Sequence, residues 1–503
     1  MKGIIYTFTV IISLGLCSYF WPKEGFQYQG ISLQFIRFEE LFPQPKQKTN
    51  KNSLDGEKIV AEKEKKNYPA YEGDISHKLI QFEDLSEADL DKFIDSLRRK
   101  KRDSISSTDF KESVYLINPP YQNASALDPF FDALNEIEQG KDQIYRVNHY
   151  GDSQIEGDRM TITLRNLFQK FFSGNGYGFI PFYDVTTPLG YERKLVGSWN
   201  HYKVFGGQKH PQKKYGPGGT SFSYNGQGNP EPYQQIQEEK NNPSIHLQLQ
   251  KSFSEIGIWY GKGKTGSKVY IWSDSIKIAE AQLDDSSQFR MIRIPLQQAV
   301  KKIQCYFSGM SPVLYGISLD PKRGIQFDNF GLRGHSGDGI MTLQVESLQL
   351  MYQVLNTKLA IIQFGGNITP YLKSEKTMAY MKEVYKNMYR HFKKALPEAS
   401  VLVLSINDVS RSVNGQYESY PNISDFRYIQ RELAIESGCA FFDLYQFMGG
   451  HSSIALWNRK NLAAKDGHLT EESRELVSKE LFKALMYEYN QYKKRISRQE
   501  ENK

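Results

Sequence analysis

The feature that most constrains the fold of this chain is an alternation of strand and helix patterns that occurs twice. In residues 143–172, a strand pattern at 143–150 is followed by an amphipathic helix pattern at 155–172. From about 341 to 492, strands are expected at 358–364, 401–406 and 440–443, with helices before, between and after them. Strands that alternate with helices form right-handed crossovers and a parallel sheet covered on both faces. The sequence therefore predicts an α/β domain built from two separated segments.

Residues 173–326 lie between these segments and follow a different pattern. They show almost no helical periodicity, but they contain short alternating runs at 244–249, 255–260, 268–272 and 289–294. Gly, Asn, Asp and Pro separate these runs. Such a pattern is typical of a β-sandwich or jelly roll. We therefore expect residues 173–326 to form an inserted β-rich domain, with residues 75–172 and 327–492 as the two parts of the α/β domain.

The N-terminal region predicts export. In residues 1–22, Lys2 precedes a nearly unbroken apolar stretch without a small-x-small cleavage site, which favours an uncleaved signal anchor over a cleaved signal peptide. Residues 43–74 are rich in Lys and Glu and almost lack aliphatic side chains, as expected of a disordered linker. We expect a periplasmic or cell-surface protein, anchored to the inner membrane by its N-terminal segment.

Charge and cysteine content argue against several classes of partner. The net charge is +7, but much of the excess Lys lies in the linker, and no Lys/Arg stripe interleaves with aromatic residues. Nucleic acid is therefore not an expected partner. The three cysteines include no C-x-x-C pair or Cys/His cluster, so no structural zinc site is expected. The sequence predicts neither a cofactor nor a metal.

Ser153 is the first candidate for chemistry. It follows the strand expected at 143–150 and precedes the helix expected from residue 155. In an open parallel sheet, ligands bind at this carboxyl edge. A helix N-terminus there would offer free N–H groups and a positive dipole end to a developing oxyanion. A serine at this position can also serve only as a helix cap.

Four short motifs, in order along the chain, resemble those of the SGNH (GDSL-like) serine hydrolases. Gly151-Asp152-Ser153 resembles the first, and its longer form Gly151–Arg159 resembles that of exported bacterial members with an additional β-domain. The runs 330–334, 365–367 and 466–470 resemble the second, third and fifth blocks. The resemblance covers residues 143–172 and 328–489. It implies an SGNH, flavodoxin-like parallel sheet flanked by helices, with an inserted β-sandwich or jelly-roll domain and an N-terminal membrane segment.

The resemblance also implies a role for each matched residue. Ser153 would be the nucleophile and His468 its base, because a serine hydroxyl needs a neighbouring imidazole to accept its proton. Asp466 would fix the tautomer of that imidazole. The N–H groups of Ser153 and Gly334 and the side-chain amide of Asn367 would form the oxyanion hole. We further expect both ends of the insert to lie near Ser153 and Gly334.

One spacing departs from the family pattern, and other residues have alternative roles. The family usually places the aspartate three residues before the histidine, where this chain has Lys465, whereas Asp466 is two before. Asp443, at the end of a strand, is therefore an alternative partner for His468. We expect His149 to be a strand histidine and His335 to lie on a surface loop rather than contact substrate. Asp158 and Arg159 are expected to form a structural ion pair.

The resemblance implies an esterase that removes O-acetyl or short acyl groups from an envelope or extracellular glycan through an acyl-serine. An O-acetyltransferase that passes the acyl group to a sugar of a cell-surface polysaccharide is an alternative, and it would need a membrane-bound acyl donor protein. The two enzymes differ only in what intercepts the acyl-enzyme. A third possibility is a non-catalytic, anchored glycan-binding protein, which the presence of Ser153, Gly334, Asn367 and His468 argues against.

Overall fold

The computed structural model describes residues 26–28, 31–33, 86–101, 105–121, 124–225, 243–263, 266–283, 289–414 and 416–501. The chain divides into two units, residues 1–74 and 75–503. In the first unit, the described residues are two short antiparallel strands, β1 (Phe26–Tyr28) and β2 (Ile31–Leu33). The membrane segment expected at 1–22 and the linker expected at 43–74 lie outside the described residues. No described helix is long and apolar enough to cross a membrane.

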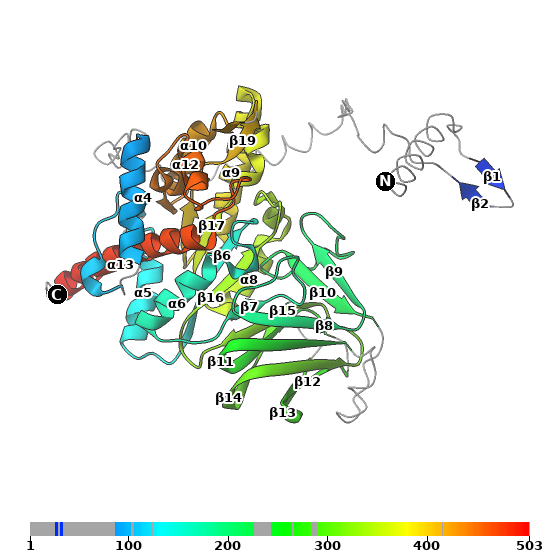
Figure 1. Cartoon of the computed structure of the whole chain (residues 1–503). Helices are drawn as coiled ribbons and strands as arrows, with labels where there is room; N and C mark the ends of the chain where they lie inside the picture. The colour runs from blue at the N-terminus through cyan, green and yellow to red at the C-terminus, as the bar shows by residue number, and fades with distance from the viewer. Residues whose placement is uncertain are drawn as a thin grey trace, which may run out of the picture. The chain divides into compact units, whose positions relative to one another are not determined.

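A six-stranded sheet forms the centre of the second unit (Figure 1). Its order is β16-β6-β17-β18-β21-β3, and every pair is parallel except β21 with β3. The first five strands thus follow the chain order 2-1-3-4-5 that is typical of flavodoxin-like sheets. This confirms the predicted parallel α/β core. The bounds are β3 (Leu116–Ile117), β6 (Ile144–Gly151), β16 (Gly324–Gly331), β17 (Thr357–Gln363), β18 (Ser400–Leu404) and β21 (Ala440–Phe442).

Helices cover both faces of this sheet, so its central strands are almost fully buried. One face, which includes Val147 and Leu402, packs against α4 (Glu87–Lys101), α5 (Asp128–Glu138), α6 (Thr161–Phe172) and α13 (Glu471–Glu501). The other face, which includes Tyr150 and Val403, packs against α8 (Val345–Leu355), α9 (Glu375–Ala395) and α10 (Ile423–Glu436). The short helices α11 (Leu444–Met448) and α12 (Ser453–Arg459) precede α13.

The described residues of the β-rich insert form nine antiparallel strands. They are β7 (Gly178–Ile180), β8 (Tyr191–Val196), β9 (Trp199–Lys203), β10 (Thr220–Tyr224), β11 (Ser244–Tyr260), β12 (Lys268–Ser273), β13 (Ile276–Gln282), β14 (Arg290–Ser308) and β15 (Leu314–Asp320). The pairing of β11 with β14 shifts register between Gln248 and Phe253. Before this shift β11 also pairs with β8, and after it with β15. All nine strands are therefore connected in one hydrogen-bonded sheet. Residues 324–326, which the sequence places in the insert, belong to β16.

Both ends of the insert lie at the amino edge of the parallel sheet. The backbone N–H of Ile325 donates to the carbonyl of Ser173 (3.2 Å), and Gly324 donates to Gln143 (2.8 Å) beside the start of β6. The expectation that these ends lie near Ser153 and Gly334 is wrong, because α6 carries the chain back to the opposite edge before the insert begins. Loops of the insert, rather than its ends, reach the carboxyl edge.

A buried ion cluster joins the insert to the parallel sheet. Arg146 on β6 donates to Asp328 on β16 (2.9 Å) and to Asp320 on β15, and all three side chains are buried. The guanidinium carbon of Arg146 also lies 5.4 Å from the ring centre of Trp259 on β11. Removing one member of such a buried cluster leaves an uncompensated charge and typically costs about 3–5 kcal/mol of stability. The insert is therefore bound to the sheet by specific buried contacts as well as by chain connectivity.

Candidate active site

The loop that carries Ser153 follows β6 directly at the carboxyl edge of the sheet. The sequence predicts a helix from residue 155, but a 3-10 turn, η3 (Glu156–Asp158), comes first and α6 begins at Thr161. Gly157 and Asp158 have φ angles of 70° and 66°, and this left-handed backbone interrupts the helix. The helix-dipole argument for Ser153 is therefore not supported, although its position at the sheet edge is as expected.

The structure brings Ser153, His468 and Asp466 together. The Oγ of Ser153 lies 2.6 Å from Nε2 of His468, and Nδ1 of His468 lies 2.9 Å from a carboxylate oxygen of Asp466. The backbone N–H of His468 donates to the other oxygen of Asp466 (3.1 Å). Gly467, with a φ of 84°, makes the tight turn that the two-residue spacing requires.

The charge of Asp466 is stabilised by the histidine that it orients. Partial burial acts to raise the pKa of Asp466, but hydrogen bonds from the backbone N–H and the ring of His468 hold it below its ordinary value. Asp466 is therefore ionised at neutral pH, as a residue that stabilises an imidazolium must be.

Asp443 does not serve as the alternative partner of His468 in this structure. Its carboxylate accepts hydrogen bonds from both Arg427 nitrogens that face it, one of them at 3.0 Å. It also accepts from the backbone N–H of Gln446 (3.1 Å) and so caps α11. The position at a strand end that made Asp443 a candidate is explained by this capping role.

Asn367 brings the second and third motifs next to the nucleophile. It lies in η5 (Gly366–Tyr371), directly after β17. Its side-chain nitrogen donates to Asp152 (2.9 Å) and to the carbonyl of His335 (3.1 Å), the neighbours of Ser153 and Gly334 respectively. Both amide hydrogens therefore have acceptors, and donation to an oxyanion requires one contact to be exchanged or shared. Gly334 has a φ of 75°, in the left-handed region that favours glycine.

Asp152 connects the nucleophile loop to Asn367. One carboxylate oxygen accepts from the Asn367 amide, and the other accepts from the backbone N–H of Gln154 (2.9 Å). Burial raises the pKa of Asp152 to about 6, although the Gln154 hydrogen bond and the nearby His468 act to lower it. The Asp152 carboxylate thus fixes the orientation of the Asn367 amide next to Ser153.

Gln154 holds the histidine turn against the nucleophile loop. Its side-chain nitrogen donates to the carbonyl of Gly467 (3.1 Å), and its side-chain oxygen accepts from the backbone N–H of Leu469 (3.2 Å). Asn407 donates to the same Gly467 carbonyl at 3.4 Å. The sequence reasoning missed both residues. For Gln154, the available signal was a long amide side chain directly after the nucleophile.

The end of the Gly151–Arg159 motif has structural rather than catalytic partners. Asp158 forms a buried, two-point ion pair with Arg165 on α6, with contacts of 2.5 and 2.9 Å. The predicted pairing of Asp158 with Arg159 is therefore wrong. Because Asp158 has a left-handed backbone, its side chain points to α6, while Arg159 donates to the carbonyl of Ser153 (3.0 Å).

Glu156 and Gly157 attach the insert to the active-site loop. The buried carboxylate of Glu156 accepts from Arg333 at 2.9 Å, and Arg333 also donates to the hydroxyl of Thr186 in the insert (2.9 Å). The backbone N–H of Leu189 donates to the carbonyl of Gly157 (3.0 Å). A β-carbon on Gly157 would lie 2.9 Å from a Thr186 methyl, so glycine permits this close approach.

The two histidines near the site have no direct contact with the triad. His149 is buried in β6, with its ring nitrogens 2.9 Å from the hydroxyl of Thr161 and 3.1 Å from the side-chain oxygen of Gln363, and burial lowers its pKa to about 4. His335 is only 1% exposed and accepts from the backbone N–H of Gly339 (3.0 Å), so the surface-loop prediction is wrong. Within the described ranges, no group of three or more His, Cys, Asp or Glu side chains could hold a metal ion.

Comparison with known proteins identifies the fold. A solved structure described as a peptidoglycan O-acetylesterase in action is similar, with a TM-score of 0.58 and 16% identity, over 72% of this chain and 96% of the other. An acetyl xylan esterase, AlAXEase, has a TM-score of 0.23 and 18% identity over 32% and 81%. A family two carbohydrate esterase from Cellvibrio japonicus has a TM-score of 0.23 and 9% identity over 63% and 99%.

Only the first of these similarities is extensive enough to support an argument, and at 16% identity it concerns the fold alone. No protein-family model matches the sequence, and no curated protein matches it either. The similarity shows that this chain shares the fold of the first structure, and the order of the four motifs along the chain resembles that of the SGNH/GDSL-like hydrolases.

Proposed function

We propose that this protein is a serine-dependent esterase that removes O-acetyl or other short acyl groups from a glycan. The observation that carries the proposal is the chain of contacts from Ser153 Oγ to His468 Nε2 (2.6 Å) and from His468 Nδ1 to Asp466 (2.9 Å). These are the distances at which a base can accept a serine proton and a carboxylate can orient the base. The fold shared with a peptidoglycan O-acetylesterase supports the same class of reaction.

In the first half of the proposed reaction, His468 takes the proton of Ser153 as its oxygen attacks the ester carbonyl. The C–O bond to the sugar then breaks, and His468 returns the proton to the departing sugar oxygen, which leaves an acyl-serine. In the second half, His468 accepts a proton from water, the hydroxide attacks the acyl carbon, and the proton returns to Ser153 as the carboxylic acid leaves.

Solvent access to the base favours hydrolysis over acyl transfer. The side chain of His468 is 34% exposed and that of Asp466 is 68% exposed. Water can therefore reach the base that must activate it, whereas efficient transfer to a sugar requires water to be excluded. Transfer to a polysaccharide hydroxyl, with a membrane-bound acyl donor protein as partner, is the alternative outcome that the experiment below distinguishes. The proposed export and anchoring by residues 1–22 apply to either reaction.

The test combines activity with direct detection of the intermediate. Wild-type protein and Ser153→Ala are mixed with p-nitrophenyl acetate, and the mass of the peptide that contains residue 153 is measured after an acid quench. We expect an acetyl group on Ser153 in wild type only, and loss of hydrolysis in Ser153→Ala with nearly unchanged thermal unfolding. Hydrolysis that persists in the variant would rule out Ser153 as nucleophile. Acetyl transfer to added oligosaccharides faster than to water would favour the transferase.

A further inference from the structure

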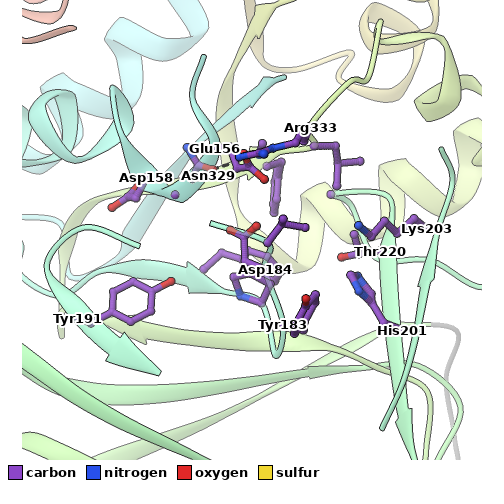
Figure 2. A pocket seen from close by; sticks show the side chains of 18 residues that line it. Glu156, Asp158, Tyr183, Asp184, Tyr191, His201, Lys203, Thr220, Asn329 and Arg333 are labelled. Carbon is purple, nitrogen blue, oxygen red and sulfur yellow. Dashed lines mark hydrogen bonds and ion pairs between the residues drawn. The ribbon is translucent and has the colours of Figure 1, made fainter. Parts of the chain in front are cut away.

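A pocket lies between the catalytic edge of the sheet and the insert, next to the proposed active site (Figure 2). On the catalytic side it is lined by Glu156 and by residues 331–333, which directly precede Gly334. On the insert side it is lined by the loop 183–185 and by His201 and Lys203 at the end of β9. The Arg333 contacts with Glu156 and Thr186 join the two sides. The pocket therefore borders the loop that carries Gly334, which we call the oxyanion loop (residues 331–334).

The insert wall contains a polar atom that has no partner in the protein. The Nε2 of His201 is buried and makes no hydrogen bond within the described part of the chain. The ring stacks on Phe222 at 4.5 Å between centroids, and burial, with Lys203 and Arg193 nearby, lowers the pKa of His201 to about 4. A neutral imidazole can accept or donate one hydrogen bond, and a buried polar atom without a partner destabilises the protein. A hydroxyl-bearing ligand would satisfy this atom.

Three further side chains in the pocket, Asp184, Lys203 and Tyr183, add a carboxyl group, an amino group and an aromatic ring. Burial, together with the nearby Glu156, raises the pKa of Asp184, while Arg193 opposes this shift. In Figure 2, Lys203 lies beside His201 on one side of the pocket, with Tyr183 next to them and Asp184 nearer the centre. Tyr183 is 49% exposed, so a large part of its ring is free to contact a ligand. Hydrogen-bond donors and acceptors beside a flat aromatic ring match a sugar, which has many hydroxyls and one apolar face.

From this arrangement we infer that the pocket between the insert and the oxyanion loop binds a sugar ring of the alcohol part of the ester, with Tyr183, Asp184 and His201 as its main contacts. The inference rests on the proposed function, because the sugar is the group from which Ser153 would take the acyl group. A long acyl chain is the competing occupant, but it would cover the Asp184 carboxyl, which within the described residues accepts only from the backbone of its own loop, at Thr186 (3.5 Å), and leave the His201 nitrogen without a partner. The polar lining therefore assigns the pocket to the alcohol side of the ester.

The inference is tested by comparing two kinds of ester substrate, with and without a sugar as the alcohol part. Acetate release is measured from chemically O-acetylated cellotetraose, xylotetraose and chitotetraose, and from p-nitrophenyl acetate, whose alcohol part is not a sugar. Tyr183→Ala and Asp184→Asn should lower the ratio of kcat/KM on at least one tetrasaccharide to that on p-nitrophenyl acetate by about tenfold, mainly through KM. The matched control is Tyr380→Ala, which removes a tyrosine that is 65% exposed on α9. It should leave both values unchanged.

The outcomes separate this inference from the proposed function. If wild type releases acetate from a tetrasaccharide and neither pocket variant changes the ratio, the pocket assignment is wrong and the esterase proposal stands. A wild-type preference for longer acyl esters that is lost in Tyr183→Ala would assign the pocket to the acyl chain instead. If wild type cleaves no tetrasaccharide ester, binding of the tetrasaccharides to Ser153→Ala is measured by NMR. Binding that Tyr183→Ala weakens then supports the pocket while the esterase proposal fails, and absence of binding overturns both.

Discussion

The two sides of the proposed triad are held in place in different ways. The nucleophile loop is enclosed: Gly151 and Asp152 are buried, and a β-carbon on Gly151 would lie 2.9 Å from Ile155 and 3.0 Å from the carbonyl of Gln363. On the histidine side, Asp466 is 68% exposed and the turn depends on a few hydrogen bonds. Close packing holds the Ser153 loop, whereas the His468 turn, packed through Leu469, depends more on hydrogen bonds. Changes on the two sides should therefore differ in size and in kind.

The largest expected effect among these variants is on the enclosed side. Asn367→Ala should lower kcat by about 10²–10³ with little change in KM, because loss of one oxyanion donor typically costs about 2.7–4 kcal/mol in the barrier. Steady-state kinetics on p-nitrophenyl acetate measure this. An effect on KM alone would make Asn367 a substrate-binding residue. The enclosed side would then be rigid because of its packing, and Asn367 would not stabilise the oxyanion.

On the exposed side, Asp466→Asn should lower kcat by about 10²-fold. In a buried serine-protease triad the same change costs about 10⁴, but water at the exposed Asp466 partly replaces the lost carboxylate. Gly467→Val should have a similar effect, because its φ of 84° disfavours other residues and the new β-carbon would lie 3.3 Å from Val409. Asp443→Asn is the matched control and should retain activity. Inactivation by Asp443→Asn with an active Asp466→Asn would contradict the observed triad.

What could be predicted from the sequence depends on whether a feature follows from a local pattern or from contacts between distant residues. The parallel sheet, the helices on both of its faces and the β-rich insert follow from hydrophobic periodicity, and the motif order brings Ser153, His468 and Asp466 to one edge. The start of α6 could not be predicted from periodicity, because the left-handed backbone at Gly157 and Asp158 interrupts an otherwise continuous apolar stripe. The roles of Gln154 and of the Glu156–Arg333 pair depend on contacts between residues far apart in the chain, which no local pattern encodes.

A smaller effect is expected where the two sides meet. Gln154→Ala should lower kcat about tenfold, because the turn 466–469 loses two hydrogen bonds that align His468 with Ser153. Hydrogen exchange at the amides of residues 467–469 should become faster, while exchange in β6 should not change. Gln154→Glu keeps the acceptor for Leu469 but not the donor to Gly467, so its kcat should be intermediate. Unchanged exchange in the turn of Gln154→Ala would show that other contacts hold it.

The smallest effect on activity is expected for His149, which lies on β6 before the Ser153 loop and acts on the pH dependence of stability. Burial holds its pKa at about 4, against about 6.5 in the unfolded chain, so protons bind the unfolded state more tightly. Its contribution is therefore fully present above pH 6.5 and is lost as the pH falls towards 4, by roughly 3 kcal/mol at most. Urea unfolding of wild type and His149→Gln at pH 7 and pH 4.5 measures this. We expect the variant to lose less stability between these two pH values.

Asp152 contributes the opposite pH dependence, and because both proteins contain it, only the difference between them reports on His149. Burial raises its pKa to about 6, so its ionised form is disfavoured in the folded protein, and this term stabilises the fold as the pH falls from about 6 towards 4. The two groups therefore act in opposite directions over nearly the same pH range. If wild type and His149→Gln showed the same pH dependence of stability, the pKa of His149 would be the same in the folded and unfolded chains, and the expectation would be wrong.

The point at which the insert leaves the sheet also determines the order in which parts of the chain can fold during synthesis. Both neighbours of β6 in the parallel sheet, β16 and β17, come after the insert, so β6 has no sheet partner until the ribosome has passed residue 324. The nine strands of the insert lie entirely within 178–320 and can pair with one another earlier. Once they have paired, Ser173 and Gly324 are already close, and the long chain closure that joins β6 to β16 costs less conformational entropy.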